Sequence, residues 1–210
     1  ERNIVEITEW DQRSNYVTQL GGSHRLPAFG DMDIQWRAAY SSSISQEPDR
    51  RQAVVAKPQN TPPSFPYAFE RGIRSWSNLR EYSRSFGADF LLPLGENSHV
   101  KFGGIVEGKS RQFNIRFFEI DGSQVDYAAN PRLYYLPMDI IFAPENFAPG
   151  RFFMHELSNP RDFYSGTQSV YSAYALVDHR FVMLDQNFRF VGGARVENSE
   201  QLVNTISPFA

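Results

Sequence analysis

Residues 99–111 read His-Val-Lys-Phe-Gly-Gly-Ile-Val-Glu-Gly-Lys-Ser-Arg, and every charge in this stretch occupies an odd-numbered position. The even-numbered positions are all uncharged, and most are valine, phenylalanine or glycine. Because successive side chains of a β-strand point to opposite faces, the stretch predicts a strand with one charged and one apolar face. We expect Lys101, Glu107 and Lys109 on the charged face and Phe102 and Val106 on the apolar face.

The same alternation with a period of two residues recurs along the chain. It predicts five further strands, at 10–24, 32–43, 80–92, 169–182 and 187–201. In the last of these the charged face carries Arg189, Arg195 and Glu197, and the apolar face carries Phe188, Phe190 and Ala194. An ordinary antiparallel sheet with one wet face gives the same alternation, so the pattern alone does not decide what covers the apolar side.

The connections between these strands differ sharply in length. Short turns rich in proline, glycine and asparagine are predicted near 26–32, 93–98 and 183–187, whereas long polar loops are predicted at 44–79 and 119–167. A barrel in an outer membrane has short turns on its inner side and long loops outside. The alternation of short and long connections therefore favours an all-β, antiparallel, up-and-down transmembrane β-barrel segment.

Composition narrows the classes of protein. The chain has 210 residues, a net charge of −3 and no cysteine, which argues against a nucleic-acid-binding protein, a disulfide framework or a thiolate metal site. Aromatic residues make up 15% of the chain, which suits a barrel in which alternate side chains meet lipid. There is no run of 18 apolar residues that would make a transmembrane helix.

Two positions break the alternation. Arg84 falls on the apolar face, about nine residues from the turn at Pro93 and hence roughly 23 Å up a tilted strand, where its head can reach water or lipid phosphate. Beyond Arg111 the pattern reverses, so that Phe113 and Ile115 take positions of the former charged face. A β-bulge or an exit from the membrane explains the reversal, and the sequence does not choose between them.

Six strands are fewer than the eight of the smallest membrane barrels, and an open sheet cannot span a membrane alone because its edge groups would be unpaired. Either strands are missed, or residues 1–210 are one part of a larger barrel wall. The chain opens Glu-Arg-Asn-Ile, with neither an initiator methionine nor a signal peptide, and this favours the second reading.

Several stretches resemble the barrel region of TonB-dependent outer-membrane receptors. The resembling hairpin runs from Tyr-Ser-Ala-Tyr-Ala-Leu-Val-Asp at 171–178 to Phe-Arg-Phe-Val-Gly-Gly-Ala-Arg-Val-Glu at 188–197, and Phe163-Tyr164 precedes it. The segments Glu-Pro-Asp-Arg-Arg at 47–51 and 91–104 are similar to the same family. The resemblance implies a 22-stranded barrel around an N-terminal plug, although neither a plug domain nor the motif that engages TonB is evident in this chain.

If the resemblance holds, the chain belongs to the Gram-negative outer membrane and contributes to the uptake of a nutrient such as a ferric siderophore, a glycan fragment or a cobalamin-like ligand. The implied partners are outer-membrane lipid, the plug domain, the TonB complex and the ligand. The six charged residues named above would face the barrel lumen, and the five apolar ones would face lipid. Candidate ligand contacts in the two long loops are Trp76, Tyr134, Tyr135, Phe147 and Phe153.

No other chemistry stands out. The four histidines form neither an H-E-x-x-H motif nor a paired metal spacing, and no G-x-S-x-G elbow or phosphate-binding glycine loop is present. We therefore expect no enzyme activity, metal or cofactor. Alternatives that stay open are a soluble all-β carbohydrate- or ligand-binding module, a β-fold hydrolase with its acid pair in the long loops, and a plain porin.

Overall fold

The computed structural model describes residues 2–57, 62, 64, 67–135 and 137–205. The described part of the chain is dominated by long antiparallel strands. Six of its eight strands are at least 15 residues long: β2 (Gln12–Leu26), β3 (Met32–Lys57), β4 (Ala68–Pro93), β5 (Ser98–Asp121), β7 (Tyr164–Met183) and β8 (Gln186–Thr205). Two shorter strands, β1 (Arg2–Thr8) and β6 (Phe153–Glu156), complete the set.

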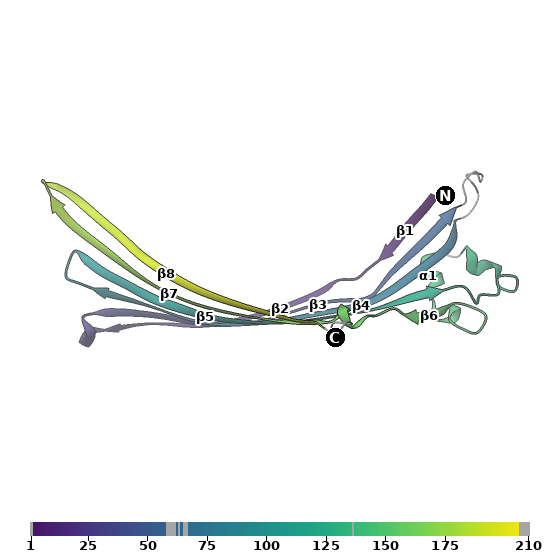
Figure 1. Ribbon diagram of the computed structural model, residues 1–210, viewed down its shortest axis with the longest axis horizontal. Helices are drawn as coiled ribbons and strands as arrows, with labels where there is room; N and C mark the ends of the chain where they lie inside the picture. Colours follow the sequence, from purple (N-terminus) through teal and green to yellow (C-terminus); the bar gives the residue numbers. More distant parts are fainter. Residues whose placement is uncertain (1, 58–61, 63, 65–66, 136, 206–210) are drawn as a thin grey trace.

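All eight strands belong to one sheet with up-and-down connectivity. Its order is β1-β3-β4-β5-β7-β8, with β2 also paired to β3 and β6 also paired to β5. Figure 1 shows the long strands running side by side in a curved array, with the three short turns at one end and α1 (Met138–Ile141) and β6 at the other. Within the described residues β2 and β8 each pair on one side only, so the sheet is open and is not a closed barrel.

Along one edge of β3, and again along one edge of β5, two separate strands pair one after the other. β2 pairs with the part of β3 nearer the short turns, and β1 pairs with residues 51–57 of the same strand. In the same way β7 pairs with 98–113 of β5, and β6 takes over at 118–121. The sheet is therefore continued past the end of β7 by a strand that belongs to the long connection.

The six strands expected from the alternation are all present. The first long connection is shorter than expected, however, because β3 continues to Lys57 and β4 begins at Ala68, so the loop predicted over 44–79 is wrong in extent. Trp76, expected in a loop, lies within β4 opposite Arg116 of β5. The remaining loop, 58–67, falls for the most part outside the described residues.

The short turns reverse the chain with residues at positive φ. The 3₁₀ turn Pro27–Phe29 ends at Gly30 (φ 71°) and Asp31 (φ 58°), and Gly95 (φ 74°) lies in the turn before β5. Leu184 and Asp185 form a two-residue loop between the paired residues Met183 and Gln186, and both have positive φ as a type I′ hairpin requires.

No β-bulge in the pairing of β5 with β4 accounts for the reversed alternation beyond Arg111. Strand β5 keeps an unbroken register with β4 from the pair Pro93–His99 to the pair Gly72–Ile120. Phe113, Ile115 and Phe117 therefore lie on the same face as Lys101, and Ile120 lies on the same face as Phe102. The bulges are elsewhere, between Glu47 and Arg50 and between Val54 and Val55 in the β3–β4 pairing.

The buried hydrophobic core lies at the end of the sheet opposite the short turns. There the segment 122–163, which we call the excursion, folds back on the ends of β3, β4 and β5. The excursion contains three 3₁₀ turns (Pro131–Tyr134, Pro144–Asn146, Pro160–Asp162), α1 and β6. The core combines three strand residues with five from the excursion: Ala53, Phe69, Ile120, Val125, Leu133, Ile141, Phe142 and Phe152.

Candidate functional site

The apolar face of the sheet is uncovered along the middle of the long strands. Of the residues expected to face lipid, Phe102 is 37% exposed, Val106 49% and Phe190 58%, and Phe188 and Ala194 are exposed as well. All the described strands belong to one sheet, so none of them supplies a second sheet over this face. These side chains are free to meet something other than the chain itself.

Aromatic side chains gather at both ends of the apolar face. Toward the short turns, Phe90 stacks on Phe102 with ring centroids 5.0 Å apart, and Phe181 stacks on Phe188 at 5.7 Å. Toward the excursion lie four exposed tyrosines, which we call the tyrosine rim: Tyr16, Tyr40, Tyr82 and Tyr171. Ten residues separate Tyr82 from Leu92, or about 25 Å of height on a tilted strand, which equals the apolar band of a membrane barrel.

Five of the six residues expected to face a lumen form ion pairs on the charged face. Lys109 and Glu107 pair at 3.0 Å, and Arg195 and Glu197 pair at 2.5 Å. The ammonium of Lys101 lies 6.0 Å from the centre of the Tyr174 ring. All six residues are brought to one face by the continuous register from β5 through β7 to β8.

Arg189, the sixth of these residues, belongs to a cluster at the short-turn end of the charged face. Its Nε donates to Asp178 Oδ1 at 2.9 Å, and its Nη2 donates to the other carboxylate oxygen. His99 Nε2 lies 3.4 Å from the same carboxylate. Asp178 is almost fully buried, so this network ties β5, β7 and β8 together near their turns.

A second network joins β3, β4 and β7 around Asp89, near the short-turn end of β4. Tyr174 donates its hydroxyl proton to Asp89, and Arg37 Nη1 lies 3.5 Å from the same carboxylate. The Tyr174 ring lies against Gly103, where an added Cβ would stand 3.0 Å from the ring and 2.5 Å from the carbonyl oxygen of Ala88. Glycine at 103 is thus required by close approach of a neighbouring ring and backbone.

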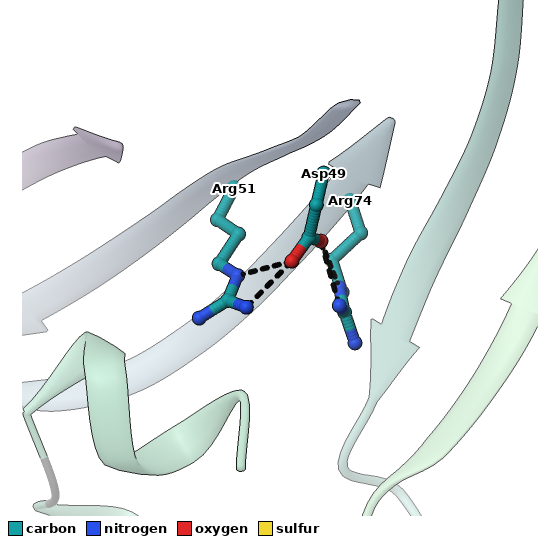
Figure 2. Close-up of polar contacts among 3 residues, drawn as sticks. All are labelled: Asp49, Arg51 and Arg74. Carbon is teal, nitrogen blue, oxygen red and sulfur yellow. Dashed lines mark hydrogen bonds and ion pairs between the residues drawn. The ribbon is translucent and has the colours of Figure 1, made fainter. Parts of the chain in front are cut away.

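Above the tyrosine rim, the Glu47–Arg50 bulge holds a carboxylate between two arginines (Figure 2). Asp49 has φ 59°, and its Oδ2 accepts from Arg51 at 2.9 and 2.5 Å while its Oδ1 accepts from Arg74 Nε at 2.7 Å. Burial raises the pKa of Asp49, but the hydrogen bonds from Arg51 and Arg74 outweigh it and hold this pKa below its ordinary value.

The same two arginines begin a series of cation–aromatic contacts across the sheet. Arg51 lies over Phe142 of the excursion at 5.9 Å, and Arg74 lies over Trp76 at 5.1 Å. Trp76 meets Phe118 of β5 edge to face at 5.3 Å, and Arg116 lies over Phe118 at 4.9 Å.

The series ends on β6, where Arg116 donates two hydrogen bonds to Glu156, each 2.9 Å long. The bond from Arg116, with a second from Ser158, lowers the pKa of Glu156 to about 2. The excursion is thereby fixed to the sheet at both ends of the series, through Phe142 and through Glu156.

The excursion holds four of the five ligand-contact candidates. Tyr134 packs edge to face on Tyr127 and Tyr135, with ring centroids 5.0 Å apart in each case. Tyr134, Tyr135 and Phe153 are exposed, whereas Phe147 packs against the core of the excursion. Trp76 lies on β4 and belongs to the arginine–aromatic series described above.

Other features of a working site are sparse. Within the described ranges, no three histidine, aspartate or glutamate side chains gather as a metal site would require. No described helix has the length and apolarity to cross a membrane. A comparison with protein-family models finds no match, and a search of curated proteins finds no significant one.

Sequence reasoning missed the networks around Asp49 and Asp89. A signal for the first was available, because Pro48 within a strand pattern points to a bulge and aspartate tolerates the left-handed conformation there. No local signal pairs Asp89 with Tyr174, since these residues are brought together only by the register of three strands.

Proposed function

We propose that this chain is part of the wall of an outer-membrane β-barrel, of the kind found in TonB-dependent receptors. The observation that carries the proposal is the uncovered apolar face, about 25 Å tall between its aromatic ends, on a sheet whose short turns all lie at one end. A second sheet over this face would be required in a soluble sandwich, and the described residues provide none.

In this proposal the excursion stands outside the cell and the short turns face the periplasm. The charged face lines the lumen, where its ion pairs hydrate the wall and meet the plug domain. Tyr134, Tyr135 and Phe153 present aromatic surface to a nutrient ligand, which by the resemblance is a siderophore, a glycan fragment or a cobalamin-like molecule. The proposal gives the chain a role in transport and none in catalysis.

Fractionation and uptake measurements test the proposal. Cells with and without the protein are compared for uptake of a ferric siderophore, cobalamin and a labelled oligosaccharide, each with and without a protonophore. We expect the protein in the outer-membrane fraction and uptake of one ligand that depends on both the protein and the proton gradient. Recovery of the protein as a soluble species without detergent would support the soluble binding module instead.

A further inference from the structure

Two arginines stand on the otherwise apolar face of β4, on either side of Tyr82. Arg80, Tyr82 and Arg84 alternate along the strand, so all three side chains point the same way, with neighbours about 6.6 Å apart. All three are exposed. Within the described part of the chain, neither Arg80 nor Arg84 forms an ion pair. By contrast, each of three other arginines on the same side of the sheet is paired with a carboxylate: Arg51, Arg74 and Arg116.

Arg80 and Arg84 lie at the upper edge of the apolar band of the proposed barrel wall. Leu92 marks the short-turn end of the apolar face on β4, and Arg84 is eight residues from it, or about 20 Å on a tilted strand. Arg80 is four residues further, at about 30 Å. The two guanidinium groups thus bracket the upper edge of an apolar band of about 25 Å, the level at which lipid headgroups lie.

The surface around Arg84 is hollowed and rich in hydroxyl groups. The Arg84 side chain lies across Gly108 of β5, where an added Cβ would be 3.6 Å from its Nε. Arg84 opens onto a shallow groove of about 390 Å³. Side chains that line this groove include Tyr40, Tyr82, Arg84, Ser110, Thr167 and Ser169.

No carboxylate lies close enough to the Arg84 guanidinium to neutralise it among the residues that pair with Arg84 across β5, β7 and β8. Arg84 pairs in register with Gly108, then Ser169, then Glu200 of β8. Glu200 is therefore three strands away, about 14 Å at the usual strand spacing. Arg84 gives this groove a positive charge, and Arg80 lies outside the groove lining, two residues beyond Tyr82 on the same face of β4.

We propose that Arg80 and Arg84 hold the phosphate of an anionic lipid headgroup in the outer leaflet, with the hydroxyl groups of the groove completing its hydrogen bonds. Guanidinium groups bind phosphate oxygens in pairs of charge-assisted bonds, and tyrosine is favoured at the level of the headgroups. This inference rests on the proposed function, because the lipid is available only to a wall that spans the membrane.

Lipid binding to the purified protein in detergent micelles tests the inference. Native mass spectrometry counts bound phosphatidic acid and diacylglycerol of the same acyl chains, two lipids that differ only in the phosphate. The variants are Arg80→Gln/Arg84→Gln and, as a matched control, Arg71→Gln, which alters an exposed β4 arginine on the opposite face. A further arm adds millimolar inorganic phosphate.

We expect wild type and Arg71→Gln to bind phosphatidic acid at least about tenfold more tightly than the double variant, with diacylglycerol bound equally weakly by all three. Equal binding of phosphatidic acid by a double variant that is still recovered in the outer membrane would overturn this inference alone. Displacement of the lipid by inorganic phosphate would overturn the assignment to a headgroup. Protein that is soluble without detergent would overturn the proposed function as well.

Discussion

At the scale of single residues, the most constrained positions are those where backbone conformation and charge coincide. Asp49 adopts φ 59° in the bulge and accepts hydrogen bonds from Arg51 and Arg74. The side chains of Asp49, Arg51 and Arg74 are only 27, 32 and 18% exposed. Asp31 also has positive φ, but its contact with Arg25 is 3.6 Å long and both side chains are over 60% exposed. The two aspartates therefore form a natural comparison.

Replacing Asp49 by asparagine keeps a residue that tolerates left-handed φ and removes the charge between the arginines. We expect a loss of about 1–2 kcal/mol in the free energy of unfolding, against less than about 0.5 kcal/mol for Asp31→Asn. Denaturant unfolding of the protein in micelles measures both. A loss for Asp31→Asn as large as that for Asp49→Asn would show that the network around Asp49 contributes nothing special.

The effect of Asp49→Asn depends on pH in a defined direction. The folded pKa of Asp49 lies below its ordinary value, so its stabilisation is complete above that ordinary value and is lost as pH falls through the folded one. The difference in stability between wild type and Asp49→Asn should be constant from pH 7 to about pH 5 and shrink below about pH 4. A difference that grows on acidification contradicts this assignment.

Gly103 and Gly108, both on β5, are another matched pair. An alanine Cβ at 103 would meet the Ala88 carbonyl at 2.5 Å, whereas at 108 the first contact is the flexible Arg84 side chain at 3.6 Å. We expect Gly103→Ala to destabilise the protein by about 1–3 kcal/mol and Gly108→Ala to be close to neutral. Unfolding midpoints in micelles distinguish the two, and equal midpoints would mean that the Tyr174 ring does not need the glycine.

At the scale of elements, the sheet and the excursion depend on different forces. The long strands are held by continuous backbone pairing and by ion pairs on the charged face. The excursion instead packs apolar residues such as Phe142 and Phe152 on the strand ends, at Ala53, Phe69 and Ile120. It is also attached to the sheet by the pairing of β6 with β5, by Phe142 under Arg51 and by Glu156 beside Arg116. Because these contacts lie only at the outer ends of β3, β4 and β5, the excursion should loosen without the loss of the sheet.

Phe142→Ala tests this independence. The ring is 2% exposed, so its removal should cost the excursion about 3–5 kcal/mol of local stability. Hydrogen exchange should become faster in 122–163 and stay unchanged in the paired parts of β5 and β7. The control is Phe153→Ala, whose ring is 53% exposed and whose loss should change neither region. Faster exchange along the whole of β5 in Phe142→Ala would mean that sheet and excursion unfold together.

The sequence predicts elements best where one face is apolar and the other charged. Strict alternation in 99–111 and 187–197 located β5 and β8, and proline and glycine located their turns. Beyond the tyrosine rim the alternation weakens, as in the serines of 41–43, so the sequence predicts a loop where the outer halves of β3 and β4 run. The excursion is harder still, because its core residues follow no period and meet only through the fold.

At the scale of the whole molecule, the chain is a wall with two faces and two unlike ends. The short turns and the excursion lie at opposite ends of the sheet, and the apolar face between them lacks a covering layer in the described residues. The open edges at β2 and β8 leave backbone groups to be paired by further strands if the wall stands in lipid. The proposed membrane wall depends on lipid, and not protein, contacting the apolar face.

Cysteine scanning along 99–111 in the protein in its native membrane tests that contact most directly. The chain has no cysteine, so each substitution introduces a single thiol. We predict that thiols at 101, 107 and 109 react with a water-soluble maleimide, whereas those at 100, 102 and 106 react only with a reagent that partitions into lipid. Even-numbered thiols that resist both reagents would place the apolar face against protein, and the account of a membrane wall would be wrong.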